Sequence, residues 1–149
     1  MPIFLRAKIL CLCLAAFSQA QTIHLYFDEN IPHVQFAVTE IKSAFESETI
    51  HLAALKDFDK ADAVQIVLCD LKAKKMLEKL DQLGGSQPGE LQSEGYSLRT
   101  AQNSIWVIGA DPAGTMYGGL ELAELIRMGG IETIADIDHN PYMAMRGTK

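Results

Sequence analysis

The chain mixes two hydrophobic periodicities, one typical of buried strands and one typical of helices with an apolar face. Apolar runs predict strands at residues 23–28, 49–55, 63–68, 95–100 and 105–108. Apolar residues three or four positions apart predict three helices, which begin near Pro32, Asp70 and Asp111. Proline suits the first helical turn, where a backbone N–H has no partner, and Asp70 and Asp111 are expected to cap their helices.

The order of these elements favours an α+β fold. They follow one another as strand, helix, strand, strand, helix, strand, strand, helix, without the strict alternation of a doubly wound parallel sheet. The strands at 95–100 and 105–108 flank the turn-prone residues 102–104 and are expected to pair. The sequence therefore predicts a mixed β-sheet with helices layered on it.

The third predicted helix is apolar over most of its circumference. Its apolar residues are Met116, Tyr117, Leu120, Leu122, Ala123, Leu125 and Ile126. They leave a narrow charged stripe of Glu121, Glu124 and Arg127. A helix with this pattern is covered on more than one side. We expect the domain's own sheet on one side and a neighbour from outside the domain on the other.

Residues 1–20 have the pattern of a cleavable signal peptide. Arg6 and Lys8 precede an apolar run at residues 9–17, and Ser18-Gln19-Ala20 supplies the small residues that signal peptidase requires. The run is shorter than the roughly 20 residues of a membrane-spanning helix. We therefore expect an exported protein, periplasmic or extracellular.

Charge and cysteine content restrict the partners of the mature chain. A formal net charge of −6 argues against nucleic acid or an anionic membrane as partner, because both attract basic patches. After cleavage Cys69 is the one remaining cysteine, so no internal disulfide is expected. We interpret the lysines of the second helix as a solvated face, with a docking patch as the alternative; they are Lys72, Lys74, Lys75 and Lys79.

Local sequence patterns indicate no catalytic or metal-binding centre. The glycine-bearing turn at residues 108–114 lacks the Lys and Ser/Thr of a phosphate-binding P-loop, and the histidines form no zinc motif. Cys69 ends an apolar strand and is interpreted as a small buried hydrophobe. Glycoside hydrolysis needs two carboxyl groups across a cleft. The local pairs are Asp28 with Glu29 at a strand end, Glu121 with Glu124 on a helix surface, and Asp136 with Asp138 in a linker. We predict no catalytic residue, no metal ligand and no cofactor.

Three blocks of sequence resemble the small α+β domain that precedes the catalytic barrel in alpha-glucuronidases and beta-N-acetylhexosaminidases. The blocks are residues 94–98 (EGYSL), 105–118 (IWVIGADPAGTMYG) and 140–147 (NPYMAMRG). In that family a strand with the pattern E-x-Y-x-L pairs with a strand that ends in glycine. A G-x-x-Y-G helix follows, and a P-x-x-x-x-R-G segment enters the first barrel strand.

The resemblance implies an accessory domain at residues 21–139 and, at residues 140–149, the first strand of a (β/α)8 barrel that is absent from this sequence. The catalytic carboxylates of the family lie in the barrel, so none is carried over. Arg146 alone is carried over, as a substrate-binding residue that acts only with the barrel present, where a guanidinium suits sugar hydroxyls. A structural ion pair of Arg146 is the alternative.

The resemblance implies the non-catalytic N-terminal domain of an exported, polysaccharide-degrading glycoside hydrolase. The ending at residues 140–149 favours an alpha-glucuronidase, with xylan or a related glycan as substrate, over a hexosaminidase. The expected partners are the catalytic barrel of the same polypeptide and, in the full enzyme, the glycan. The alternative is a self-sufficient exported α+β module that binds a glycan or a protein.

We predict that the exported protein begins at Gln21, because Ser18-Gln19-Ala20 ends the leader. N-terminal sequencing of secreted material should read Gln-Thr-Ile. Secreted material that begins at Met1 would contradict this prediction.

Overall fold

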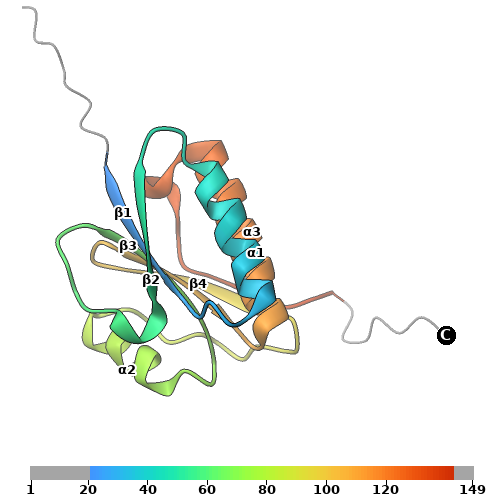
Figure 1. Ribbon diagram of the computed structural model, residues 1–149. Helices are drawn as coiled ribbons and strands as arrows, with labels where there is room; N and C mark the ends of the chain where they lie inside the picture. The colour runs from blue at the N-terminus through green and yellow to red at the C-terminus, as the bar shows by residue number, and fades with distance from the viewer. Residues whose placement is uncertain (1–20, 143–149) are drawn as a thin grey trace, which may run out of the picture.

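The computed structural model describes residues 21–142, which form a six-stranded sheet with helices on both faces (Figure 1). The strands are β1 (Thr22–Phe27), β2 (Thr49–Ala54), β3 (Val64–Asp70), β4 (Tyr96–Ala101), β5 (Ser104–Gly109) and β6 (Ile137–His139). The helices are α1 (Pro32–Ala44), α2 (Lys74–Gln82) and α3 (Pro112–Gly129), with single 3-10 turns at Leu55–Asp57 and Ile131–Thr133. The expected α+β fold is confirmed.

The sheet has the order β2-β1-β3-β5-β4-β6, and its first four strands run parallel. β4 runs antiparallel to both of its neighbours, which makes the sheet mixed, as expected. β4 and β5 form the expected hairpin, in which Ala101 lies opposite Ser104 and Gln102 adopts φ 54°. Parallel strands cannot be joined by a tight turn, so helix α1 connects β1 to β2 across one face.

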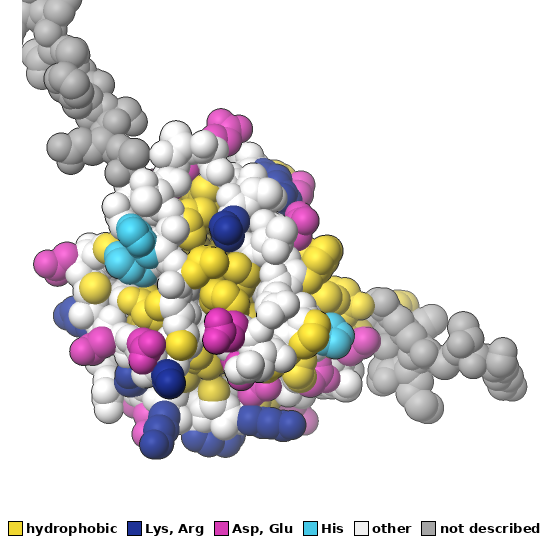
Figure 2. Space-filling model, in the orientation of Figure 1, with side chains coloured by type: hydrophobic (Ala, Val, Ile, Leu, Met, Phe, Trp, Pro, Cys, Tyr) yellow, Lys and Arg dark blue, Asp and Glu magenta, His cyan; other side chains and the backbone are white. Residues whose placement is uncertain are grey.

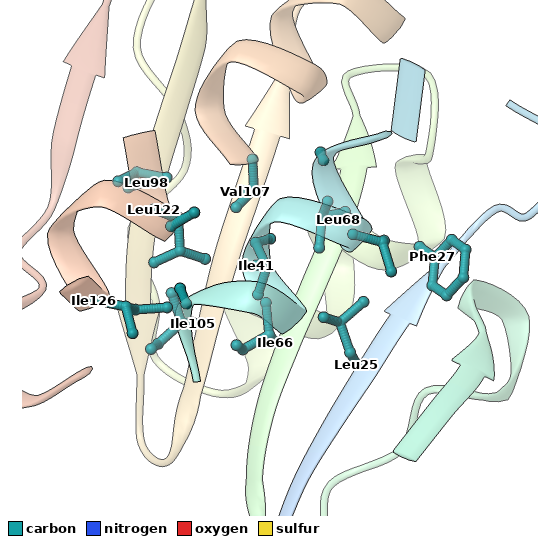
Figure 3. Packing of buried hydrophobic residues seen from close by; sticks show 14 of the residues in the cluster. Leu25, Phe27, Ile41, Ile66, Leu68, Leu98, Ile105, Val107, Leu122 and Ile126 are labelled. Atoms are coloured by element: carbon teal, nitrogen blue, oxygen red, sulfur yellow. The ribbon is translucent and has the colours of Figure 1, made fainter. Parts of the chain in front are cut away.

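Alternate side chains of the central strands build a core on each face of the sheet. On β3, Ile66 belongs to the core under α1 and α3, whereas Val67 belongs to the core under α2. Figure 3 shows the first core, in which Ile41 of α1 and Leu122 of α3 lie over the sheet. Trp106 of β5 is completely buried in the second core.

Helix α3 packs against α1 as well as against the sheet, and the two helices lie side by side in Figure 1. A Cβ atom on Gly119 would lie 2.6 Å from the Cβ of Ala37, so glycine is needed where the helices approach. Arg127 of α3 also pairs with Glu40 of α1 at 3.1 Å. Helix α1 therefore covers part of α3 within the domain, whereas Tyr117, Leu120 and Leu125 are only partly buried. The expectation of a neighbour from outside the domain stays a prediction.

Two further details correct the sequence interpretation. Residues 137–139 form the edge strand β6, so Asp138 lies in a strand and not in a linker. Asp70 does not cap α2: its Oδ1 accepts the N–H of Lys72 at 2.9 Å and closes a turn before the helix. The N-cap residue is Ala73, which has no capping side chain. The N–H of Ala73 also donates to the carbonyl oxygen of Asp70, and the helix begins at the next residue, Lys74.

The core between α3 and the sheet should carry much of the stability. We expect Leu122→Ala to lower the free energy of unfolding by about 2–5 kcal/mol, because Leu122 is fully buried and a cavity would remain. The matched control is Leu52→Ala on the edge strand β2, where the side chain is 47% exposed. It should cost about 1 kcal/mol or less in urea unfolding. Equal losses would contradict this description of the core.

Candidate functional site

Two of the family-like blocks, residues 94–98 and 105–118, meet at one corner of the domain, where Asp111 joins them. Its Oδ1 accepts the N–H of Gly114 at 2.8 Å and caps α3, as expected. Its Oδ2 accepts the N–H of Glu94 and the hydroxyl of Ser93, both at 3.0 Å. These bonds hold Glu94 at φ 64°, a conformation that few residues other than glycine adopt.

The environment of Asp111 favours its charged form. Burial alone would raise the pKa of the carboxyl group. The hydrogen bonds from Glu94, Gly114 and Ser93, together with the charge of His33, outweigh burial and hold the pKa of Asp111 below its ordinary value. Asp111 is therefore a charged structural bridge between β4 and α3.

Glycines allow α3 to lie directly on the β4–β5 hairpin. A Cβ atom on Gly114 would collide with the carbonyl oxygen of Gly95. One on Gly118 would lie 2.7 Å from Cγ1 of Val107 and 3.1 Å from Cβ of Tyr96. The glycines are close-packing positions, as the sequence indicated.

An aromatic and acidic cleft of about 320 Å³ opens beside this packing. It lies between α3, the start of β4 and the end of β6, and it is lined by Glu94, Tyr96, Tyr117, Leu120, Glu121, His139 and Pro141. The rings of Tyr96 and His139 stack with centroids 5.1 Å apart. Burial, and then the charge of Glu121, raise the pKa of Tyr96 to about 12, so the phenol stays protonated.

The buried guanidinium of Arg99 holds the edge strand β6. Arg99 donates to Asp138 at 2.6 Å and to the carbonyl oxygen of Ile137 at 2.8 Å. Asp138 also accepts the hydroxyl of Ser97 and the N–H of Gly89. Burial opposes ionisation of Asp138, but these donors and the charge of Arg99 hold its pKa below the ordinary value. This network fixes the segment that leads to Pro141.

The other carboxylates proposed from the sequence also have structural or surface positions. Asp136 accepts the N–H of Thr100 at 2.9 Å and the hydroxyl of Ser86 at 3.0 Å, so it has a structural role, as Asp138 does. Asp28 accepts the N–H of Asn30 at 3.0 Å in the turn after β1. The described residues give no support to a catalytic pair.

Sequence reasoning missed one histidine pair. His24 of β1 and His51 of β2 are register partners in neighbouring strands, and their rings stack with centroids 5.2 Å apart. They are 27 positions apart in sequence, so no local motif could show this contact. Within residues 21–142, however, no group of three or more His, Cys, Asp or Glu side chains is placed to hold a metal ion.

Two further expectations meet different outcomes. Cys69 is buried, and burial followed by the charge of Asp70 raises the pKa of its thiol to about 12, which agrees with an inert hydrophobe. Arg146 lies outside the described residues, as does most of the expected barrel strand. No helix in the described part of the chain has the length and apolar character to cross a membrane.

The sheet is mixed, with α1 and α3 on one face and α2 on the other. Residues 15–138 match the family model described as Glycosyl hydrolase family 20, domain 2. The chain belongs to this family. The match supports the glycoside hydrolase part of the sequence resemblance and does not single out the alpha-glucuronidases. No curated protein matches the sequence.

Two solved structures share the fold. One is described as a GH138 enzyme targeting pectin rhamnogalacturonan II, and it matches 78% of this chain with 16% identity and a TM-score of 0.50. The other, described as CpGH84D, matches 78% of this chain with 13% identity and a TM-score of 0.58. This chain spans 15% and 19% of the lengths of those two chains.

The bridge at Asp111 should make stability depend on pH. A lowered pKa in the folded state stabilises the protein above the ordinary value of about 3.9, and this contribution is lost as the pH falls through the folded pKa. We expect Asp111→Asn to lower the free energy of unfolding by about 1–2 kcal/mol at neutral pH, because an amide NH₂ would face the donors of Glu94 and Ser93. The loss should shrink in acid.

Urea unfolding between about pH 3 and pH 7 measures this difference. Asp81→Asn is the matched control, because Asp81 is an exposed carboxylate on α2, away from this corner. It should change stability little at any pH. An Asp111→Asn variant that loses the same stability in acid as at neutral pH would disprove the role of the charge.

Proposed function

We propose that this chain is the non-catalytic N-terminal domain of a larger, exported, polysaccharide-degrading glycoside hydrolase. The observation that carries the proposal is the family match over residues 15–138 to a domain numbered second in a glycoside hydrolase family. Two further facts support it. The chain spans less than a fifth of the two similar structures, and Asp136 and Asp138 serve as structural acceptors.

In this proposal the partner is a catalytic barrel that begins at residues 140–149. The cleft beside α3 lies next to Pro141, where the described chain leaves the sheet. Tyr117 and Leu120 of α3 are only partly buried there, although α1 covers the other side of the helix. An apolar, aromatic surface at the exit of the chain suits contact with the next domain. The glycan would meet the full enzyme, with Arg146 as its substrate-binding residue.

Two parent activities remain candidates. The ending at residues 140–149 favours an alpha-glucuronidase-like enzyme that acts on xylan or a related glycan. The family match instead favours a hexosaminidase-type parent, because that model belongs to glycoside hydrolase family 20. A self-sufficient exported module that binds a glycan or a protein is the alternative to both.

The native protein tests this proposal. Tryptic peptides of this chain should be found in a secreted protein several times longer than 149 residues. That protein should hydrolyse an aryl glucuronide or an aryl N-acetylglucosaminide, and the preferred substrate decides between the two parents. The chain expressed alone should hydrolyse neither, because Asp136 and Asp138 are held by structural partners.

Variants of the chain provide the control. If the isolated chain shows turnover that Asp136→Asn or Asp138→Asn abolishes, the non-catalytic assignment is wrong. A native protein no larger than this chain would reject the missing barrel and support the self-sufficient module.

A further inference from the structure

The parallel half of the sheet contains a topological switch point between β1 and β3. The two strands are parallel neighbours. The chain leaves β1 for α1, which packs on one face, and leaves β3 for α2, which packs on the other. Connections that diverge to opposite faces leave a crevice at the carboxyl ends of the strands, which is where open α/β sheets bind ligands.

A hollow of about 640 Å³ lies at this point. It is formed by the residues after β1, the end of β2 and the first turn of α2. Its lining residues have three kinds of chemistry and lie on different elements. The cationic ones are Lys56, Lys72, Lys74 and Lys75. Figure 2 shows Lys and Arg side chains gathered along the lower edge of the molecule, where Figure 1 draws α2.

The structure separates the lysines that the sequence grouped together. Lys79 donates to the carbonyl oxygen of Phe58 and lies 5.6 Å above the centre of its ring, so it has a packing role. Lys72, Lys74 and Lys75 instead line the hollow, where Lys56 joins them from the segment after β2. The lysine run is therefore more than a solvated helix face.

Two of these lysines occupy positions that cost helix stability. Lys74 and Lys75 begin α2, where the helix dipole disfavours positive charge. Ala73 at the N-cap offers no side-chain acceptor, and the first turn contains no acidic residue. A bound anion would relieve both defects. Local conflicts of this kind in an otherwise consistent sequence occur at functional sites.

The remaining lining residues suit a sugar ring. Asp28 and Glu29 supply carboxylate acceptors for hydroxyl groups on the side of β1. Phe27, Leu55 and Met76 supply apolar surface for the C–H groups of the ring. Cations, carboxylate acceptors and apolar groups thus border the same hollow. A bare phosphate would use only the lysines and would be repelled by the two carboxylates.

We propose that this crevice binds an anionic saccharide, whose carboxylate meets the lysines and whose hydroxyls meet Asp28 and Glu29. The choice of a saccharide rests on the proposed function, whereas anion binding rests on the lysines alone. The site lies on the parallel half of the sheet and shares no lining residue with the cleft beside α3. It would hold a uronate-bearing glycan on the accessory domain itself.

NMR titration of the full chain with a galacturonate trimer tests the proposal. Amide shifts should move at residues 28–30, 54–56 and 72–76, with a dissociation constant of about 1 mM or tighter. A neutral galactose trimer should bind at least tenfold more weakly. Raising NaCl from about 50 to about 500 mM should weaken binding of the charged trimer, because the lysines are exposed.

A matched pair of double variants isolates the lysines. Lys72→Gln with Lys75→Gln should weaken binding at least tenfold, whereas Lys42→Gln with Lys60→Gln removes the same charge elsewhere and should leave binding unchanged. Equal effects of the two double variants would overturn the site. The wild-type salt and neutral-trimer experiments decide the matter if a variant fails to fold.

Two other outcomes are informative in different ways. If inorganic phosphate binds more tightly than the galacturonate trimer and depends on the same lysines, the saccharide assignment is wrong. If the neutral trimer binds as well as the charged one, the charge argument is wrong. Neither result bears on the size or activity of the native protein, so the proposed function is tested separately.

Discussion

The packing of α3 against both the sheet and α1 is the constraint on which the rest of the domain depends. Gly114, Gly118 and Gly119 face Gly95, Tyr96 and Ala37, and each leaves too little room for a Cβ atom. Glycine in a helix costs roughly 0.5–1 kcal/mol relative to alanine, so three of them weaken α3 as an isolated helix. The packing of Leu122 and its neighbours on β3 and β5 offsets that cost. The stability of α3 therefore depends on its packing against the sheet and α1.

The edge of the sheet follows from this placement. With α3 lying on β4, the chain returns through the turn at Ile131–Thr133 and adds only three residues of strand beside β4. So short a strand gains little from its ladder hydrogen bonds. Arg99 adds side-chain hydrogen bonds to the carbonyl oxygen of Ile137 and to the carboxylate of Asp138, and these bonds also hold the strand in place. The ion pair itself is a weak source of stability, because the Asp138 side chain is 41% exposed. A buried Arg99 left without its carboxylate would be costly, which favours one register for β6.

Much of this architecture was predictable from local patterns. The strands with apolar runs, the hairpin at β4 and β5, the cap at Asp111 and the glycine-rich packing of α3 all depend on residues close in sequence. β6 could not be predicted, because three residues with one apolar side chain show no periodicity. The contact of His24 with His51 depends on strand order, which the sequence does not encode locally. The cover of α3 by α1 was missed for the same reason.

The lysines at the start of α2 show how tertiary structure changes the meaning of a local pattern. In sequence, Lys72, Lys74 and Lys75 alternate with apolar residues and match an ordinary amphipathic helix. In the structure they border the carboxyl ends of β1 and β2, beside Asp28 and Lys56, which are distant in sequence.

The first two family-like motifs occupy the other part of the sheet, at β4, β5 and the start of α3. They account for how this part of the domain is built. None of their residues lines the crevice at the carboxyl ends of β1 and β2. The two proposals thus concern separate surfaces: the neighbouring domain is proposed at the cleft beside α3, and the ligand at the carboxyl ends of β1 and β2.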